Sequence, residues 1–259
     1  MKNTIKKLSV ISLLLTLALT LSSCSDTNAK KDEQDTARRQ VALLEQCEDL
    51  GQDYIDSFIF FGESTTYHLK SRGVLKDGKD TMQVWGTRSG TAQLDLGIST
   101  LKVVYPRTSE ELTLSEALGR EAPQRILFTF GLNGAVSKIK QGEEYFAACY
   151  TELIDLVRAS SPQTQIFLQS CFPVSEEMDT TAYGVSAEVL NGYIRKINEW
   201  TLSLAEREGV FFLNSYEVMA NENGALRVEF AAPDGYHLTR AAYEEMLMYL
   251  RTHSCEVTK

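Results

Sequence analysis

The fold of this chain is decided by residues 58–66, which read FIFFGESTT. The first four residues are apolar and mostly aromatic, a composition typical of a buried β-strand. Gly62 ends the apolar run, and Glu63 and Ser64 follow it with two threonines, a pattern that favours the start of a helix. The stretch therefore predicts a strand that turns directly into a helix, with the Ser64 hydroxyl at the turn.

Apolar segments of strand type and helix type alternate along the rest of the chain. We expect strands at 82–85, 101–106, 125–130, 165–171 and 210–213, and helices at 65–70, 145–159, 187–208 and 238–250. Short apolar strands alternating with helices favour a parallel sheet covered on both faces. The sequence therefore predicts an α/β fold with a mostly parallel central sheet.

Residues 1–23 have the pattern of a lipoprotein signal peptide. Three lysines within the first seven residues precede a leucine-rich stretch at 8–21. This stretch is short of the ~20 apolar residues of a membrane-spanning helix, but it suits a signal peptide. It closes on LSSC at 21–24, which resembles a bacterial lipobox in which Cys24 receives the lipid. We expect a lipid anchor on the extracytoplasmic face of the cell membrane, with an ordinary secretory peptide as the alternative.

The remaining chain divides into a tether and one domain. Residues 24–52 are expected to form a polar tether and a short helix, because apolar residues recur at helical spacing over 41–54. With 259 residues and 43% hydrophobic content, the chain can bury one ordinary core. We place this domain at 53–255.

Charge and cysteines narrow the classes of partner. The net charge of −9 argues against a nucleic-acid partner, which calls for clustered Lys and Arg. Cys47, Cys149, Cys171 and Cys255 show neither C-x-x-C spacing nor a nearby His, so no metal site is expected. Cys149 falls in an apolar helical pattern typical of core; disulfide pairing and oligomeric state stay open.

Polar residues follow several of the predicted strands. These are Ser64, Gly90 in a Ser-Gly-Thr turn, Asn133 in Gly-Leu-Asn-Gly, and Asp234 with His237 in PDGYH at 233–237. The carboxyl ends of parallel strands meet in one crevice, so these residues are expected to converge. We expect Ser64 to be a nucleophile, His237 its base and Asp234 the carboxylate that orients His237. The N–H groups of Ser64 and Gly90 and the Asn133 amide would bind an oxyanion.

These motifs, in this order, resemble the SGNH (GDSL-type) hydrolase family over roughly residues 54–251. The resemblance implies a flavodoxin-like three-layer α/β/α sandwich, a triad of Ser64, Asp234 and His237, and an oxyanion hole of Ser64, Gly90 and Asn133. It implies no metal and no organic cofactor. Family members cleave esters, often acetyl groups on sugars, or lipid and thioester bonds.

We therefore expect a lipid-anchored extracytoplasmic serine esterase. Its substrate would be a small-molecule or polysaccharide O-acyl ester, with O-acetyl carbohydrate favoured, and its membrane contact would be the lipid. Two departures from the family leave alternatives open, since Glu63 stands where Asp is usual and Gly134 where an acidic residue is usual. The alternatives are a surface binding lipoprotein that has lost turnover, and a lipid or thioester hydrolase. His68 is expected to be structural, or else to face the cleft.

Overall fold

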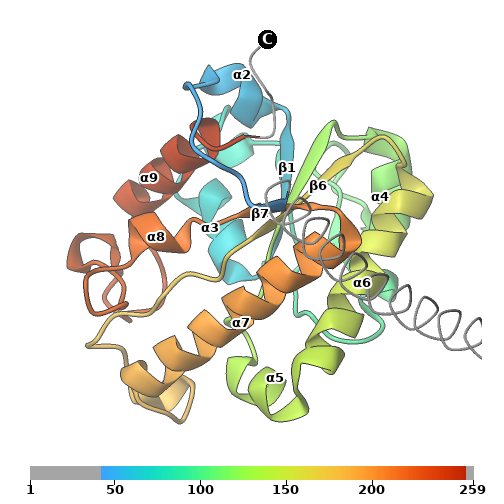
Figure 1. Ribbon diagram of the computed structural model, residues 1–259. Helices are drawn as coiled ribbons and strands as arrows, with labels where there is room; N and C mark the ends of the chain where they lie inside the picture. The colour runs from blue at the N-terminus through green and yellow to red at the C-terminus, as the bar shows by residue number, and fades with distance from the viewer. Residues whose placement is uncertain (1–41, 255–259) are drawn as a thin grey trace, which may run out of the picture. The chain divides into compact units, whose positions relative to one another are not determined.

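A five-stranded parallel sheet forms the centre of the computed structural model, which describes residues 42–254 (Figure 1). The strand order is β2-β1-β5-β6-β7, and every pairing within this sheet is parallel. The strands are β1 (Phe58–Gly62), β2 (Val84–Trp85), β5 (Arg125–Thr129), β6 (Gln165–Gln169) and β7 (Phe211–Leu213). The predicted α/β fold with a mostly parallel sheet is thus confirmed.

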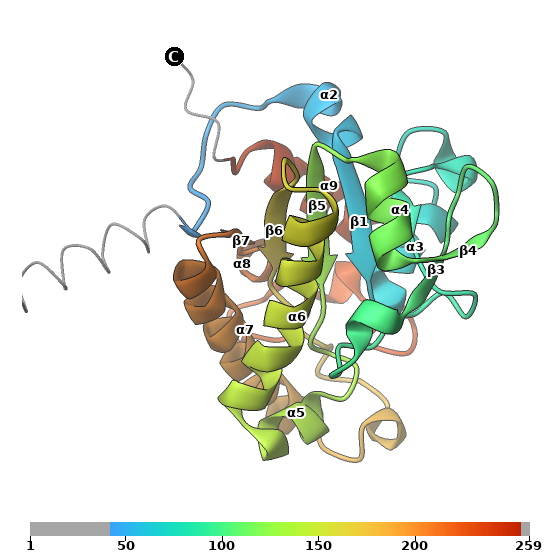
Figure 2. The same ribbon diagram turned by 90° about the vertical axis from the view of Figure 1, so that its right-hand side faces the viewer.

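Helices cover both faces of this sheet (Figure 2). One face is covered by α4 (Leu114–Glu121), α6 (Glu143–Ser160) and α7 (Ala187–Glu208), with the short α5 (Ala135–Gln141) packed against α6 and α7. The other face is covered by α2 (Gly51–Asp56), α3 (Ser64–Ser71), α9 (Arg240–Arg251) and the short α8 (Tyr216–Met219). Three layers result, as the sequence resemblance implies.

The smaller elements lie in the connections. An antiparallel pair, β3 (Lys102–Val104) with β4 (Glu111–Thr113), forms outside the main sheet. Four single-turn 3₁₀-helices are described: η1 (Gly78–Asp80), η2 (Ile98–Thr100), η3 (Thr180–Ala182) and η4 (Val228–Phe230).

The strands are apolar throughout because both of their faces are buried. In β1, Ile59 and Phe61 join the core under α4, α6 and α7, whereas Phe58 and Phe60 join the core under α3 and α9. Alternate residues of a strand point to opposite faces, so a strand between two helical layers needs apolar residues at every position.

Polar caps fix the ends of the helices. Ser186 precedes α7 and accepts a hydrogen bond from the Val189 N–H, and Gly209 ends this helix in the left-handed conformation. Thr113 and Glu116 form a reciprocal capping box at the start of α4.

The helix predicted over residues 41–54 is wrong for most of its length. Residues 43–50 contain no helix, and Leu43 instead bridges Phe212 in the parallel sense beside β7. The Leu44 N–H donates to the Phe212 carbonyl over 3.0 Å, and the Leu44 side chain is buried. Apolar side chains at helical spacing here serve an extended segment that packs on the sheet, so the compact unit begins before residue 53.

Several predictions fall outside the described residues. They concern the signal peptide, the lipidation site Cys24, the tether up to residue 41, and Cys255. Within residues 42–254, no helix has the length and apolarity needed to cross a membrane. Cys149 and Cys171 are buried free thiols, as expected of Cys149.

The strand order places β1 at the point where the chain changes direction across the sheet. From β1 the chain runs outward to β2 and then returns to the other side of β1 as β5. The loops that follow β1 and β5 diverge at such a switch point and leave a crevice at the carboxyl ends of the strands.

Candidate active site

The turn after β1 is built by a glycine in close contact with β5. A Cβ atom on Gly62 would lie 2.3 Å from the Thr129 carbonyl oxygen and 2.5 Å from Thr66 Oγ1. Only glycine fits this approach, so the strand ends here and Ser64 becomes the first residue of α3. The leading N–H groups of a helix lack intrahelical acceptors, which favours negative charge beside Ser64.

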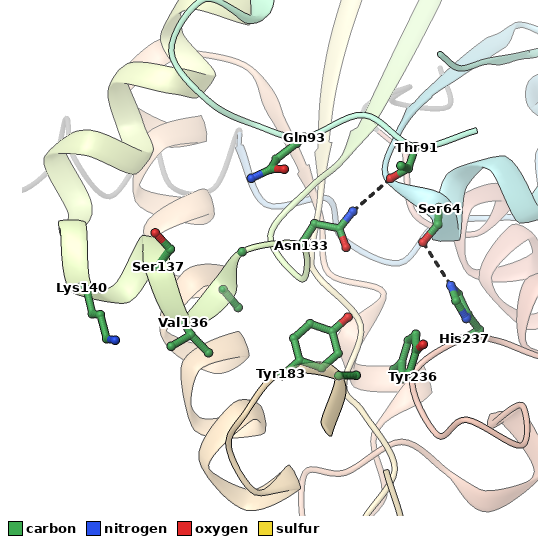
Figure 3. Close-up of a pocket in the computed structure, with 13 residues that line it drawn as sticks. Ser64, Thr91, Gln93, Asn133, Val136, Ser137, Lys140, Tyr183, Tyr236 and His237 are labelled. Atoms are coloured by element: carbon green, nitrogen blue, oxygen red, sulfur yellow. Dashed lines mark hydrogen bonds between the residues drawn. The ribbon is translucent and has the colours of Figure 1, made fainter. Parts of the chain in front are cut away.

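Three side chains form a hydrogen-bonded chain at this edge (Figure 3). Ser64 Oγ lies 3.1 Å from His237 Nε2, and His237 Nδ1 lies 2.8 Å from Asp234 Oδ2. Ser64 and His237 are 173 residues apart in the sequence, so the fold alone brings them together. A hydroxyl bonded to an imidazole that is held by a carboxylate is the arrangement that makes a serine nucleophilic.

Asp234 is fixed by its own loop. Its Oδ1 atom accepts the N–H groups of Tyr236 at 3.1 Å and His237 at 2.9 Å, which leaves Oδ2 for the imidazole. Burial raises the pKa of this carboxyl, but the hydrogen bonds from His237 and Tyr236 outweigh it and hold the pKa below its usual value. Asp234 is therefore ionised at neutral pH and favours the tautomer with the proton on His237 Nδ1.

The His237 ring lies between two other rings. Its centroid is 4.6 Å from that of His68 and 4.6 Å from that of Tyr236. Burial, followed by the charge of His237, lowers the pKa of His68. His68 thus backs the imidazole as a neutral ring and does not line the pocket, in agreement with the structural role preferred from sequence.

Asn133 lies across the pocket from His237 (Figure 3). Its Nδ2 atom donates to Thr91 Oγ1 over 3.0 Å, a bond that orients the side-chain amide. An amide has two N–H donors, so one remains for a ligand beside Ser64.

Gly90 is placed differently from the sequence expectation. Its N–H donates to the Thr87 carbonyl over 2.9 Å, and its Cα packs against the Tyr67 ring. Thr91, the next residue, lines the pocket, and Gly90 does not. Its predicted role as an oxyanion donor would require this N–H to exchange its bond with Thr87.

Glu63 points into the protein and joins two loops. The side chain is 3% exposed, and its Oε1 and Oε2 atoms accept the N–H groups of Gly131 at 2.8 Å and Asn133 at 3.0 Å. Burial raises the pKa of Glu63 to about 7, although these backbone N–H groups and Lys138 act in the opposite direction. The longer side chain at this position is thus accommodated by the loop after β5.

Gly134, the second departure from the family pattern, also has a backbone role. It precedes α5 with φ at 73°, in the left-handed region where an acidic side chain would be strained.

The pocket beside Ser64 has a volume of about 700 Å³. Tyr183 and Tyr236 form one wall with their rings edge to face, 5.6 Å apart. Amide and hydroxyl groups of Gln93, Asn133 and Ser137 face the same space, and Lys140 stands at the end far from Ser64 (Figure 3). The remaining lining residues are Thr91, Gly134, Ala135, Val136, Ala182 and His237.

Thr91, Tyr183 and the inward carboxylate of Glu63 were missed as site residues from the sequence. Thr91 had a signal, because it directly follows Gly90 in the Ser-Gly-Thr turn. Tyr183 lies in a connection without a readable motif and reaches the site only through the fold. Within residues 42–254, no group of three or more His, Cys, Asp or Glu side chains is arranged to hold a metal ion.

Comparison with known proteins identifies the class. The model of the GDSL-like lipase/acylhydrolase family matches residues 60–245, and the chain belongs to this family. It is a hydrolase family that includes esterases. No curated protein matches the sequence.

Solved structures agree on the fold. A Streptococcus pneumonia protein described as a platelet activating factor is 17% identical, with a TM-score of 0.51, covering 90% of this chain and 97% of its own. A GDSL-like lipase from Bacteroides thetaiotaomicron is 14% identical, with a TM-score of 0.48, covering 75% of this chain and 85% of its own. The aryl esterase of M. smegmatis is 16% identical, with a TM-score of 0.47, covering 75% and 95%.

Proposed function

We propose that this chain is a lipid-anchored extracytoplasmic serine esterase that hydrolyses O-acyl esters, with O-acetyl groups on carbohydrate as the favoured substrate. The observation that carries the catalytic part is the chain of contacts from Ser64 Oγ through His237 to Asp234, at 3.1 and 2.8 Å, open to the pocket.

In the first half-reaction Ser64 Oγ attacks the acyl carbon while His237 Nε2 takes the hydroxyl proton. The carbonyl oxygen becomes an oxyanion beside the start of α3 and the Asn133 amide, with the Gly90 N–H as a predicted third donor. The ester C–O bond then breaks, and His237 returns the proton to the leaving alkoxide. Ser64 retains the acyl group.

In the second half-reaction water replaces the alcohol. His237 takes a proton from the water as its oxygen attacks the acyl carbon, and returns that proton to Ser64 Oγ as the acid leaves. Every step uses side chains of this chain alone.

The nature of the pocket supports a carbohydrate acceptor. The tyrosine wall offers ring faces and hydroxyls, and the opposite side offers the amides of Gln93 and Asn133 and the Ser137 hydroxyl. A sugar presents apolar ring faces and many hydroxyls, so it uses both kinds of contact.

Hydrolysis of an activated acetate ester and of an acetylated sugar tests the catalytic part. We expect turnover by the unaltered protein and by Ser71→Ala, a control serine on the same helix, and a loss of at least about 1,000-fold in Ser64→Ala. Equal, negligible rates in the unaltered protein and Ser64→Ala would contradict it. A rate that climbs steadily with acyl length would favour a lipid or thioester hydrolase instead.

The anchoring part rests on the LSSC pattern at residues 21–24. Metabolic labelling with a radioactive fatty acid should mark the unaltered protein in a bacterial host. Cys24→Ala should remain unlabelled and leave the membrane fraction, while it keeps esterase activity. Equal labelling of both would refute the lipobox assignment.

A further inference from the structure

Glu63 joins the two loops that build the site. It directly precedes Ser64, yet its carboxylate bonds to backbone N–H groups 68 and 70 residues further along, at Gly131 and Asn133. One of these N–H groups belongs to the residue whose side-chain amide faces the pocket. The serine turn and the Asn133 loop are thereby tied through one buried side chain, in addition to the β1–β5 pairing below them.

The groups around this carboxylate offer it little compensation for burial. Lys138 on α5 is the nearest cation, but its ammonium group is already paired with Asp95 at 2.5 Å. Tyr150 on α6, Cys171 after β6 and Tyr183 before α7 also face it, and the Glu63 charge raises the pKa of all three. These neighbours stay neutral, so Glu63 is the group here that titrates near neutral pH, its pKa being raised to about 7.

Protonation would change what Glu63 can hold. An ionised carboxylate only accepts hydrogen bonds, so both oxygens serve the two N–H donors. A protonated carboxyl carries an O–H that must itself donate, and two donors that face each other repel. One of the two ties, to Gly131 or Asn133, must then loosen.

We propose that ionised Glu63 is a positioning group for the site, which holds the Asn133 loop against the serine turn, and that its protonation releases this loop and lowers activity. This inference rests on the proposed function for its catalytic consequence. It makes the site respond to two protons in acid: one on His237, which removes the base, and one on Glu63, which loosens the oxyanion site.

Glu63→Gln and Glu63→Asp test the proposal by kcat and KM measured between pH 4.5 and 9. Glutamine places an N–H₂ group against the backbone donors at every pH, so we expect kcat to fall about 10- to 100-fold with little change in KM. Its acid limb should follow one proton, whereas that of the unaltered enzyme follows two. Aspartate keeps the carboxylate at shorter reach, so it should recover part of kcat and the two-proton limb.

Glu152→Gln is the matched control. Glu152 on α6 also accepts two backbone N–H groups, from Gly97 at 2.9 Å and Ser99 at 3.1 Å, but it does not line the pocket. This variant should keep kcat and the two-proton acid limb. A one-proton limb in the unaltered enzyme, or the same limb in Glu63→Gln, would overturn the proposal.

Thermal unfolding supplies a readout that needs no turnover. The folded-state pKa of Glu63 lies above its ordinary 4.5, so the folded protein holds this proton more tightly than the unfolded chain. The unfolding midpoint of the unaltered protein relative to Glu63→Gln should therefore fall as pH rises from 4.5 to 7. A flat difference would overturn the proposal. The expected slope without hydrolysis of any ester would sink the proposed function and keep the proton-linked tie.

Discussion

The imidazole rings of His68 and His237 lie 4.6 Å apart, centroid to centroid, at an interplanar angle of 52°. His68 stands one turn after Ser64 on α3, so one helix carries both the serine and the ring that backs its partner. Nδ1 of His68 is buried and has no hydrogen-bond partner within the described residues. A charge on His68 would therefore be poorly solvated and would face the imidazolium that forms during turnover.

Replacement of His68 by Phe should flatten the acid sensitivity of folding. The folded-state pKa of His68 is lowered by burial, so the unfolded chain binds this proton more tightly than the folded protein. This contribution to stability is present above pH 6.5, the ordinary value, and is lost as pH falls below it. The unfolding midpoint of the unaltered protein relative to His68→Phe should thus decrease in acid. A difference that stays constant with pH would contradict the buried, neutral ring.

Asp234→Asn should lower kcat by about 1,000- to 10,000-fold without loss of folding. The asparagine Oδ1 can still accept the N–H groups of Tyr236 and His237. Its N–H₂ group then faces His237 Nδ1 and forces the imidazole proton onto Nε2, where Ser64 needs an acceptor. The control is Asp179→Asn, which likewise caps its own loop through the Thr181 N–H. Comparable losses in both variants would argue against a triad.

Thr91→Val should lower kcat about three- to tenfold, the effect of one hydrogen bond. Valine has nearly the same shape but cannot accept the 3.0 Å bond from Asn133 Nδ2. Thr91→Ser restores the hydroxyl and should restore most of kcat. A serine variant as slow as the valine variant would mean that the methyl group, and not the hydrogen bond, matters at this position.

Gly235→Ala should destabilise the protein by about 3 kcal/mol and reduce activity. Gly235 has φ at 77°, and an added Cβ would lie 2.7 Å from Met178 Cα, a backbone atom that cannot move alone. The loop that carries Asp234 and His237 would have to shift. Gly209→Ala is the matched control, because Gly209 also has positive φ, at 64°, but open space around it. We expect it to cost about 1 kcal/mol and to leave kcat unchanged. Urea unfolding with parallel kinetics separates the two.

The central strands and long helices could be predicted from local pattern. Strands buried on both faces are continuous apolar runs, as in FIFF at 58–61, and α7 begins and ends where its Ser186 and Gly209 caps predict. Strand β4 could not be predicted, since Glu111–Thr113 is short, mostly polar and paired only with β3. The wrong helix over 41–54 has a related cause, because its apolar residues find their partners on β7 and α9 rather than along one helix face.

The residues proposed for the triad could be identified from motif order, because they sit at the ends of recognisable strands or in a short local loop. The Thr91–Asn133 bond and the ring contacts of Tyr183 depend on loops that meet only in space. Glu63 illustrates the limit best. Its sequence neighbour is Ser64, but its side chain serves a loop 68 residues away.

Covalent labelling by a fluorophosphonate, followed by mass analysis of the intact protein and its peptides, tests the account most directly. The reagent phosphonylates only an activated serine. We expect one added group on the peptide that contains Ser64, none on Ser64→Ala, and much slower addition in His237→Gln. An unlabelled native protein, or equal labelling of the native protein and Ser64→Ala, would contradict the claim that Ser64 is a nucleophile.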